Sequence, residues 1–436
     1  MTAGRGIRRI VKATARTGAT AIVAAILLDA VVLACSNEAP GAVGTDTHFP
    51  MVYGDRPTVA ELSAFGRQMF FDPRLSASGR QSCSSCHDPA RAYGPPDRRV
   101  VQPGGAAMDR YGFRNAPSLT YLHSPIAFTE HFYEAEVSGG KDDEGPTGGR
   151  TWDGRVNNGH DQALMPLLDP NEMANTSREE VVSRLARTDY VDAFRKAVSA
   201  PGEDVMADPD DAVTWMTVAL ETFEQSNAEF HPFTSKYDAY LRDEIELGAA
   251  EQRGLTAFND MKKGNCASCH PGSHKSPQNH IPIFTDFGHV ALAVPRNREL
   301  PANRDPDFHD LGVCGPLRTD LSDRPEYCGL FRTPSLRNVA LRKSFFHNGS
   351  LHALRDVVDF YATRDLTPQK WYGRGASRKY DDLPERYWKN VNSDVPFKPK
   401  ADGRPRLTAR DVDDIVAFLG TLTDGYVTPA ARTARK

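Results

Sequence analysis

Two copies of one short motif constrain this chain more than any other feature. "QSCSSCH" ends at His87 and "GNCASCH" ends at His270. Cys-x-x-Cys-His is the attachment signal of a c-type haem, in which both thiols bond to the porphyrin and the histidine ligates the iron. Chance predicts about 0.003 copies in a chain with this cysteine and histidine content. The sequence therefore predicts two covalent haems, held by Cys83, Cys86 and His87 and by Cys266, Cys269 and His270.

Each motif follows an amphipathic stretch, which makes the chain an internal repeat. "TVAELSAFGRQMFFDPRL" places Leu62, Phe65, Met69 and Phe70 on one helical face, and "LGAAEQRGLTAFNDMKKGNCASCH" repeats the arrangement. We therefore expect a mainly α fold with two cytochrome c-like haem domains and long loops. The expected boundaries are 51–232 for the N-terminal domain, 233–428 for the C-terminal domain and 429–436 for a disordered tail.

The N-terminus has the layout of a secretory signal. Positive charge in "GRGIRRIVKATAR" precedes an apolar run that ends in small residues, so residues 1–35 are predicted to direct export to the periplasm. Cys35 follows "VLA", which resembles a bacterial lipobox, and its lipidation would anchor the protein to the membrane. The alternative is ordinary cleavage that removes Cys35 or leaves it inert. Residues 36–50 are expected to be a linker.

Composition and the remaining cysteines agree with export. The chain has 436 residues, a net charge of −4 and 39% hydrophobic residues, which is a soluble globular composition with no reason to expect nucleic acid. Cys314 and Cys328 are left outside the haem motifs, and in an oxidising compartment they are predicted to form a disulfide worth roughly 3 kcal/mol. A metal site is the alternative, but no further ligand stands at zinc spacing.

The chain resembles the bacterial diheme cytochrome c peroxidase and MauG superfamily over nearly all of its mature length. The matching blocks are "MFFDPRLSASGRQSCSSCH", "RNAPSL", "TWDGR", "QALMPLLDPNEM", "GNCASCH", "FRTPSLRNVALRKSFFHNGSL" and "DVVDFY". The resemblance implies a haem-dependent peroxidase. Its first haem, in the N-terminal peroxidatic domain, would meet hydrogen peroxide, and its second haem, in the electron-transfer domain, would store and pass electrons.

The first haem is predicted to be open to peroxide. In the classical peroxidases of this superfamily, a histidine after the first motif blocks that haem until reductive activation. Residues 88–117 contain no histidine, and the next one is His123. Met108 is the remaining candidate for a cap.

Polar groups over the first haem are assigned by the same resemblance. It places Gln162 as a positioning group, Glu172 as the general acid and base, and Pro166 between them. It also makes Trp152 in "TWDGR" a charge relay between the haems. The alternatives are solvent-facing or capping roles for Gln162 and Glu172, and an ordinary core position for Trp152.

The second haem is expected to have a tyrosine as its other ligand. The chain contains nine methionines and the last is Met261, so no methionine follows the second haem motif. The superfamily's ligand position falls on Tyr361, as in MauG-type members, and a phenolate stabilises the ferric state. His347 and His352 are competing ligands, and a half-buried core tyrosine is the other alternative.

The resemblance also implies one calcium ion between the domains. Its ligands would be the Asn115 side chain and backbone oxygens near Thr333 and Ser335, because oxygen donors suit a hard cation.

Three functions fit these features. The first is MauG-like oxidation of a protein partner by peroxide, with oxidising equivalents leaving through surface Trp or Tyr residues. The second is a cytochrome c peroxidase that draws electrons from a small cytochrome or cupredoxin. The third is a non-enzymatic diheme electron carrier, against which Gln162 and Glu172 argue because a carrier needs no distal acid. Tyr361 and the uncapped first haem favour the first function.

Overall fold

The computed structural model describes residues 57–122, 126–133, 143–272, 281–373 and 379–429. Every element below belongs to one compact unit, Pro50–Lys436. The predicted signal segment, Cys35, the linker and residues 430–436 of the predicted tail lie outside the described residues. Within the described part of the chain, no helix is long and apolar enough to cross a membrane.

Helices dominate the structure, and the prediction of a mainly α fold with long loops is confirmed. The α-helices are α1 Val59–Phe71, α3 Gly159–Leu168, α4 Arg178–Leu185, α5 Val191–Val198, α6 Pro209–Ser226, α7 Lys236–Leu241, α8 Ala249–Asn259, α9 Leu354–Thr363, α10 Pro368–Tyr372 and α11 Ala409–Gly420. Two short antiparallel pairs join β1 Pro103–Gly104 to β2 Arg110–Tyr111 and β3 His289–Val290 to β4 Phe331–Arg332.

The first and last of these helices both begin at a threonine cap. Thr58 caps α1 in a capping box with Glu61, and Thr408 caps α11 in the same way with Asp411. Each box satisfies backbone N–H groups that the first turn leaves without partners. Local sequence therefore starts both helices before any tertiary contact is made.

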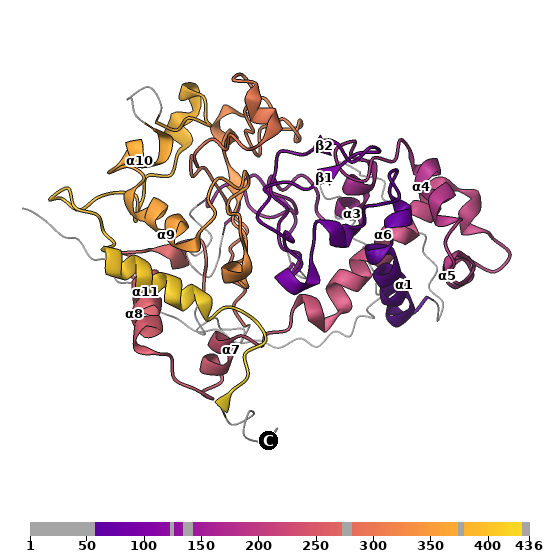
Figure 1. Ribbon diagram of the computed structural model, residues 1–436, viewed down its shortest axis with the longest axis horizontal. Coiled ribbons are helices and arrows are strands. Elements are labelled where there is room, and N and C mark those ends of the chain that lie inside the picture. Colours follow the sequence, from indigo (N-terminus) through magenta and orange to yellow (C-terminus); the bar gives the residue numbers. More distant parts are fainter. Residues whose placement is uncertain (1–56, 123–125, 134–142, 273–280, 374–378, 430–436) are drawn as a thin grey trace, which may run out of the picture. The chain divides into compact units, whose positions relative to one another are not determined.

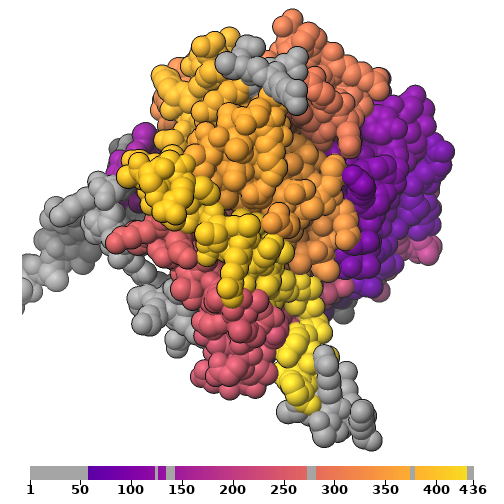
Figure 2. Space-filling model, turned by 60° about the vertical axis from the view of Figure 1, so that its left-hand side comes forward, coloured from indigo at the N-terminus to yellow at the C-terminus, as the bar shows by residue number. Residues whose placement is uncertain are grey.

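The helix that precedes each haem motif packs closely against one helix that follows the motif. Helix α1 packs on α6, and α8 packs on α11 (Figure 1). In Figure 2 the yellow segment that carries α11 lies directly over the rose segment that carries α8. At each crossing the first helix has a glycine, and no larger residue would fit without a shift. A Cβ on Gly66 would stand 1.9 Å from the Ala219 carbonyl oxygen, and a Cβ on Gly254 would stand 1.9 Å from the Asp414 carbonyl oxygen. The sequence repeat is therefore also a structural repeat.

Two large hydrophobic cores accompany the two helix pairs. The buried members of the first lie between Leu62 and Phe230, and those of the second between Tyr237 and Leu422. A third, aromatic cluster forms around Phe360, Tyr380 and Phe397. The change from one core to the next falls near residue 233, while the exact domain boundaries stay a prediction.

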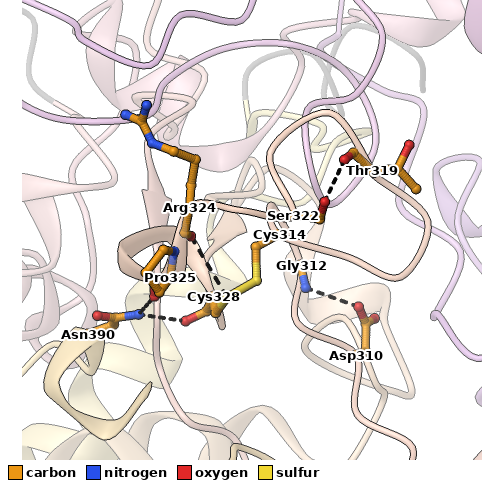
Figure 3. The surroundings of a disulfide bond; sticks show 9 residues. All are labelled: Asp310, Gly312, Cys314, Thr319, Ser322, Arg324, Pro325, Cys328 and Asn390. Atoms are coloured by element: carbon orange, nitrogen blue, oxygen red, sulfur yellow. Dashed lines mark hydrogen bonds between the residues drawn. A yellow bond between two sulfur atoms is a disulfide. The ribbon is translucent and has the colours of Figure 1, made fainter. Parts of the chain in front are cut away.

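A disulfide joins Cys314 to Cys328, with their Cα atoms 4.9 Å apart (Figure 3). Asn390 fastens the end of the loop, because its amide nitrogen donates to the carbonyl oxygens of Pro325 at 2.8 Å and of Cys328 at 3.0 Å. The bridge holds the loop that follows Asp310, and the Asp310 carboxylate pairs with Arg114 from the N-terminal half. A covalent link therefore supports a contact between distant parts of the sequence.

Candidate active site

The two Cys-x-x-Cys-His motifs fold into the same turn. Each begins with a short 3₁₀ helix, Cys83–Ser85 in the first and Cys266–Ser268 in the second. The histidine backbone N–H then donates to the carbonyl of the first cysteine, at 2.9 Å for His87 and 2.8 Å for His270. Because the two motifs share one backbone conformation, both present two thiols and one imidazole in the same way.

Both histidines are prepared to ligate iron. The Nδ1 of His87 lies 3.0 Å from the Tyr93 carbonyl oxygen, and that of His270 lies 2.9 Å from the Phe284 carbonyl oxygen. A carbonyl accepts the Nδ1–H, which directs the Nε2 lone pair to a ligand. Burial lowers the pKa of both imidazoles to about 4, so each is neutral as a metal ligand must be. The donor set fits two c-type haems.

Burial also keeps the four thiols protonated. It raises the pKa to about 12 for Cys83, Cys86 and Cys266 and to about 11 for Cys269. Redox-active and zinc-binding cysteines act as thiolates, so these surroundings do not suit either role. They suit thiols that end as thioethers.

The second motif opens into a large cavity of about 1380 Å³. Cys266, Cys269 and His270 line it, together with Tyr361 from α9 and Trp152 from the loop before α3. This volume exceeds the 300–1,000 Å³ of ordinary ligand pockets and is consistent with a porphyrin site. The structure thus brings together, around one space, residues that the sequence places more than two hundred positions apart.

Tyr361 and its rival His347 both line the cavity, but their immediate neighbours differ. Burial has the largest effect on the Tyr361 pKa and raises it. The nearby Cys269 and Cys266 raise this pKa further, whereas Arg364 lowers it. His347 instead stacks on Phe331, with ring centroids 3.5 Å apart. Of the three candidates, the tyrosine is the one whose electrostatic neighbours are the haem-binding cysteines.

His352 lies apart from the haem-binding residues. Its Nδ1 lies 3.0 Å from the Lys343 carbonyl oxygen, and its Nε2 lies 3.8 Å from Glu299. The imidazole of His352 therefore contacts the loop that precedes α9.

The polar residues predicted over the first haem lie on and after α3. Gln162 is half-buried on this helix, and its side-chain amide makes no hydrogen bond to any described residue. Pro166 stands inside the same helix. Glu172 follows in a turn beneath the β1–β2 hairpin, where its carbonyl accepts from the Gly105 N–H at 2.8 Å. Met108, the alternative cap, is half-buried at the tip of that hairpin.

The carboxyl of Glu172 is tuned for proton transfer near neutral pH. Solvent still reaches the side chain, but surrounding protein excludes enough water to raise its pKa to about 7, with a further rise from Asp169 and a decrease from Arg155. Its charge also raises the pKa of the Cys86 thiol, which places it on the side of the first haem motif.

Comparison with known proteins places the chain in a family. A family model described as di-haem cytochrome c peroxidase matches residues 60–246. The methylamine utilization protein MauG of Paracoccus denitrificans is 33% identical over 87% of this chain and 93% of that protein. The cytochrome c551 peroxidase of Pseudomonas aeruginosa is 30% identical over 72% of this chain and 75% of that protein.

A solved structure supports the same placement. The crystal structure of the diheme peroxidase BthA from Burkholderia thailandensis matches with a TM-score of 0.74 and 40% identity, covering 85% of this chain and 87% of that one. The chain belongs to the di-haem cytochrome c peroxidase family.

Family membership confirms the coarse prediction of function. The protein is a haem-dependent peroxidase, a peroxide-dependent oxidoreductase with two c-type haems. Membership implies hydrogen peroxide as substrate and a protein as redox partner. Membership does not distinguish oxidation of a protein from scavenging of peroxide, because MauG and a cytochrome c peroxidase both match.

Trp152 ties together two loops at the centre of this di-haem protein. Its indole N–H donates to the Asn115 carbonyl at 2.7 Å, and its own carbonyl accepts from the Arg332 N–H at 2.8 Å. The side chain is half-buried and lines the cavity. The charge-relay role of Trp152 stays a prediction.

Two of the three predicted calcium ligands have other partners in the structure. The Asn115 amide oxygen accepts from the Ser344 hydroxyl at 3.2 Å, and the Thr333 carbonyl accepts from the Thr285 hydroxyl at 2.7 Å. At Ser335, where the prediction names a backbone oxygen, the side-chain hydroxyl donates to the Ile283 carbonyl at 2.6 Å. Calcium binding stays a prediction.

Sequence reasoning overlooked one carboxyl near the first haem motif. Glu224 on α6 is half-buried, and burial raises its pKa to about 7. Its charge raises the pKa of the Cys83 thiol. The sequence does contain an indication of this carboxyl. Glu224 continues the buried stripe of Thr217 and Leu220 at helical spacing, which puts a carboxyl on an apolar helix face.

Proposed function

We propose that this enzyme performs MauG-like chemistry: peroxide is activated at the first haem, and oxidising equivalents pass through the second haem to a protein partner. When bound, the haems supply cleavage of the peroxide O–O bond and storage of the oxidising equivalents. Tyr361 carries the proposal, because this tyrosine faces the second motif's cavity in a chain that has no methionine after Met261. A phenolate favours oxidised iron, whereas a methionine ligand favours the reduced state of a simple electron carrier.

Glu172 moves the proton in this proposal. A proton must leave the inner oxygen of peroxide and reach the outer one, so that the outer oxygen departs as water. A carboxyl with a pKa of about 7 can take up and return a proton at neutral pH. Gln162 has an amide uncommitted to described residues and would orient the peroxide.

Aromatic rings would carry oxidising equivalents from Tyr361 towards the surface. Tyr361 stacks on Phe397 with centroids 5.2 Å apart, and the Arg364 guanidinium lies 3.6 Å from the centre of the Phe397 ring. Arg364 also lies over Tyr380, whose ring is 5.6 Å from that of the partly exposed Trp388. Trp388 is the proposed point of exit.

A second candidate function is a cytochrome c peroxidase that takes electrons from a small cytochrome or cupredoxin. It would use the same Glu172 and Gln162, and the likeness to a cytochrome c551 peroxidase supports it. A non-enzymatic diheme carrier does not fit membership of a peroxidase family, and a carrier has no use for a carboxyl with a pKa raised to about 7 beside the first haem motif.

The proposed location is the periplasm. A disulfide between Cys314 and Cys328 requires an oxidising compartment to persist, and the N-terminal sequence has the layout of an export signal. Lipidation of Cys35 would add a membrane anchor and stays a prediction.

The test compares the resting protein with variants at the second haem. The as-isolated ferric protein should show one high-spin and one low-spin haem by electron paramagnetic resonance and should react with peroxide without prior reduction. Tyr361→Phe should abolish the low-spin signal. Tyr361→Met should raise the potential of the second haem and shift activity from partner oxidation towards turnover with a small cytochrome.

Two results would decide against the proposal. An unchanged low-spin spectrum in Tyr361→Phe would assign the ligand to His347 or His352 and favour the ordinary peroxidase. Two low-spin haems in the resting enzyme would show that the first haem is capped. Trp388→Phe should lower partner oxidation without changing either haem spectrum, and normal partner oxidation in this variant would place the exit elsewhere.

A further inference from the structure

Two arginines in the central cavity lack the acidic partner that other buried arginines have. Arg337 pairs with Asp238 at 2.7 Å, and Arg364 pairs with Asp365 at 2.7 Å. Arg332 and Arg342 form no ion pair with any carboxylate in the described part of the chain, although both line the cavity. Neither guanidinium contacts a described carboxylate, although Asp153 and Arg150 lie near enough to Arg332 to act on it electrostatically.

Carbonyl oxygens hold both guanidinium groups but leave most of their donors unused. Arg332 donates from Nη1 to the Gly149 carbonyl at 3.1 Å. Arg342 donates from Nε to the Ser344 carbonyl at 3.2 Å and from Nη2 to the Ala116 carbonyl at 3.1 Å. A guanidinium has five N–H donors, so several on each remain available to the cavity.

Burial without a contacting carboxylate is unfavourable for these groups. It lowers the pKa of Arg342 to about 10, well below that of an ordinary arginine. Buried charges in proteins are normally paired or hydrogen-bonded to an opposite charge. The folded protein therefore has room and charge for an anion at this place.

We propose that Arg332 and Arg342 bind the propionate groups of the second haem. The propionates are the anionic groups of a porphyrin, and a guanidinium fork matches a carboxylate with two parallel hydrogen bonds. The vinyl groups, which bond to Cys266 and Cys269, lie on the opposite edge of the ring from the propionates. The arginines therefore have to lie at the end of the cavity away from the cysteines.

The contacts of the arginines are with segments other than the second haem motif. The backbone of Arg332 donates to the Trp152 carbonyl, and Arg342 donates to the carbonyl of Ala116, the residue after the Trp152 partner Asn115. The cysteines instead belong to the turn that follows α8. Arg342 also lies near enough to His87 to lower its pKa, so its charge reaches the first haem site as well.

The test is the midpoint potential of each haem, measured by spectroelectrochemistry from pH 5.5 to 9, a range of about three units around neutrality. In the wild-type holoprotein the potential of the second haem should be nearly independent of pH around neutrality, because paired propionates stay ionised. Arg332→Gln should lower that potential, since losing a cation favours the more positive ferric iron. Arg342→Gln should lower the potentials of both haems.

The pH dependence separates charge pairing from a general loss of positive charge. In each Gln variant an unpaired propionate takes up a proton as the pH falls, so the potential of the second haem should rise towards low pH. Arg332→Lys and Arg342→Lys keep the charge and should stay closer to wild type. Arg355→Gln is the matched control, because Arg355 is exposed on α9 and pairs with the exposed Asp413. It should leave both potentials unchanged.

Several results would overturn the proposal. One is a second-haem potential that is unchanged in both Gln variants. Another is a wild-type second-haem potential that already rises towards low pH, as expected when a propionate is unpaired. A wild-type potential that changes with phosphate concentration at constant ionic strength would show that a mobile anion fills the site instead. The wild-type measurements decide even if a Gln variant fails to fold, and covalent attachment keeps the haems in the folded variants.

Discussion

At the scale of single residues, the distal carboxyl has a property that sequence could not assign. Glu172 lies in a turn that contacts the β1–β2 hairpin, and although solvent reaches its side chain, surrounding protein excludes enough water to raise its pKa to about 7. Glu224 reaches a similar pKa on helix α6, through its own burial. Two carboxyls near the first haem motif could therefore transfer protons, and they can be separated by mutation.

The rate of peroxide cleavage should rise with pH through about 7, because Glu172 must be ionised before it can accept the peroxide proton. Glu172→Gln should remove this rise and slow cleavage by about 10²–10⁴-fold. Stopped-flow spectroscopy across the pH range measures both effects. Glu224→Gln is the matched comparison, and a loss of the pH-dependent rise in that variant alone would transfer the acid–base role to Glu224.

At the scale of elements, each haem motif depends on one close helix crossing. Helices α1 and α6 meet at Gly66, and α8 and α11 meet at Gly254. Each glycine faces a backbone carbonyl, which cannot move aside as the end of a flexible side chain can. The distance between the paired helices is therefore set by the absence of a side chain.

Gly66→Ala and Gly254→Ala should each lower the free energy of unfolding by about 1–3 kcal/mol, the usual effect of overpacking a core. The reason is that the added Cβ would stand 1.9 Å from a carbonyl oxygen and push the helices apart. Denaturant unfolding of the holoprotein measures the change. Gly420→Ala serves as the control at the end of α11, because a Cβ there meets no atom within 4 Å. Equal stability of all three variants would mean that the crossings are looser than described.

At the scale of the whole molecule, distant segments meet around Trp152. Arg114 joins them through ion pairs to Asp153 at 2.6 Å and Asp310 at 2.7 Å, all three side chains being buried. The disulfide supports the loop after Asp310, and Trp152 adds its hydrogen bond to Asn115. A rigid connection of this kind would hold a charge relay at a constant distance from both haem sites.

Trp152→Phe should slow the oxidation of the second haem by peroxide while leaving the first reaction of peroxide unchanged. The phenyl ring retains much of the packing but is harder to oxidise and loses the N–H donated to Asn115. Stopped-flow absorbance that resolves the two haems provides the measurement. Trp215→Phe is the control, since Trp215 packs against the first hydrophobic core on α6. If both variants oxidise the second haem at the wild-type rate, the relay lies elsewhere.

The sequence by itself determined the features that depend on neighbouring residues. The spacing of Cys83, Cys86 and His87 specifies haem attachment, and Thr58 and Thr408 start their helices, because both depend on atoms a few bonds apart. The repeated order of helix and haem motif then gave the mainly helical fold. The family could also be recognised, because its motifs are short continuous blocks.

Only the tertiary structure decided the features that depend on solvent exclusion and long-range contact. It placed Tyr361 in one cavity with Cys266 and Cys269, and among the described residues it left Arg332 and Arg342 without a carboxylate in ion-pair contact. The helical spacing of Glu224 indicates an apolar face, but only burial in the folded protein raises its pKa to about 7. Burial and charge pairing depend on segments that are distant along the chain, whereas covalent motifs and helix caps are written within a few consecutive residues.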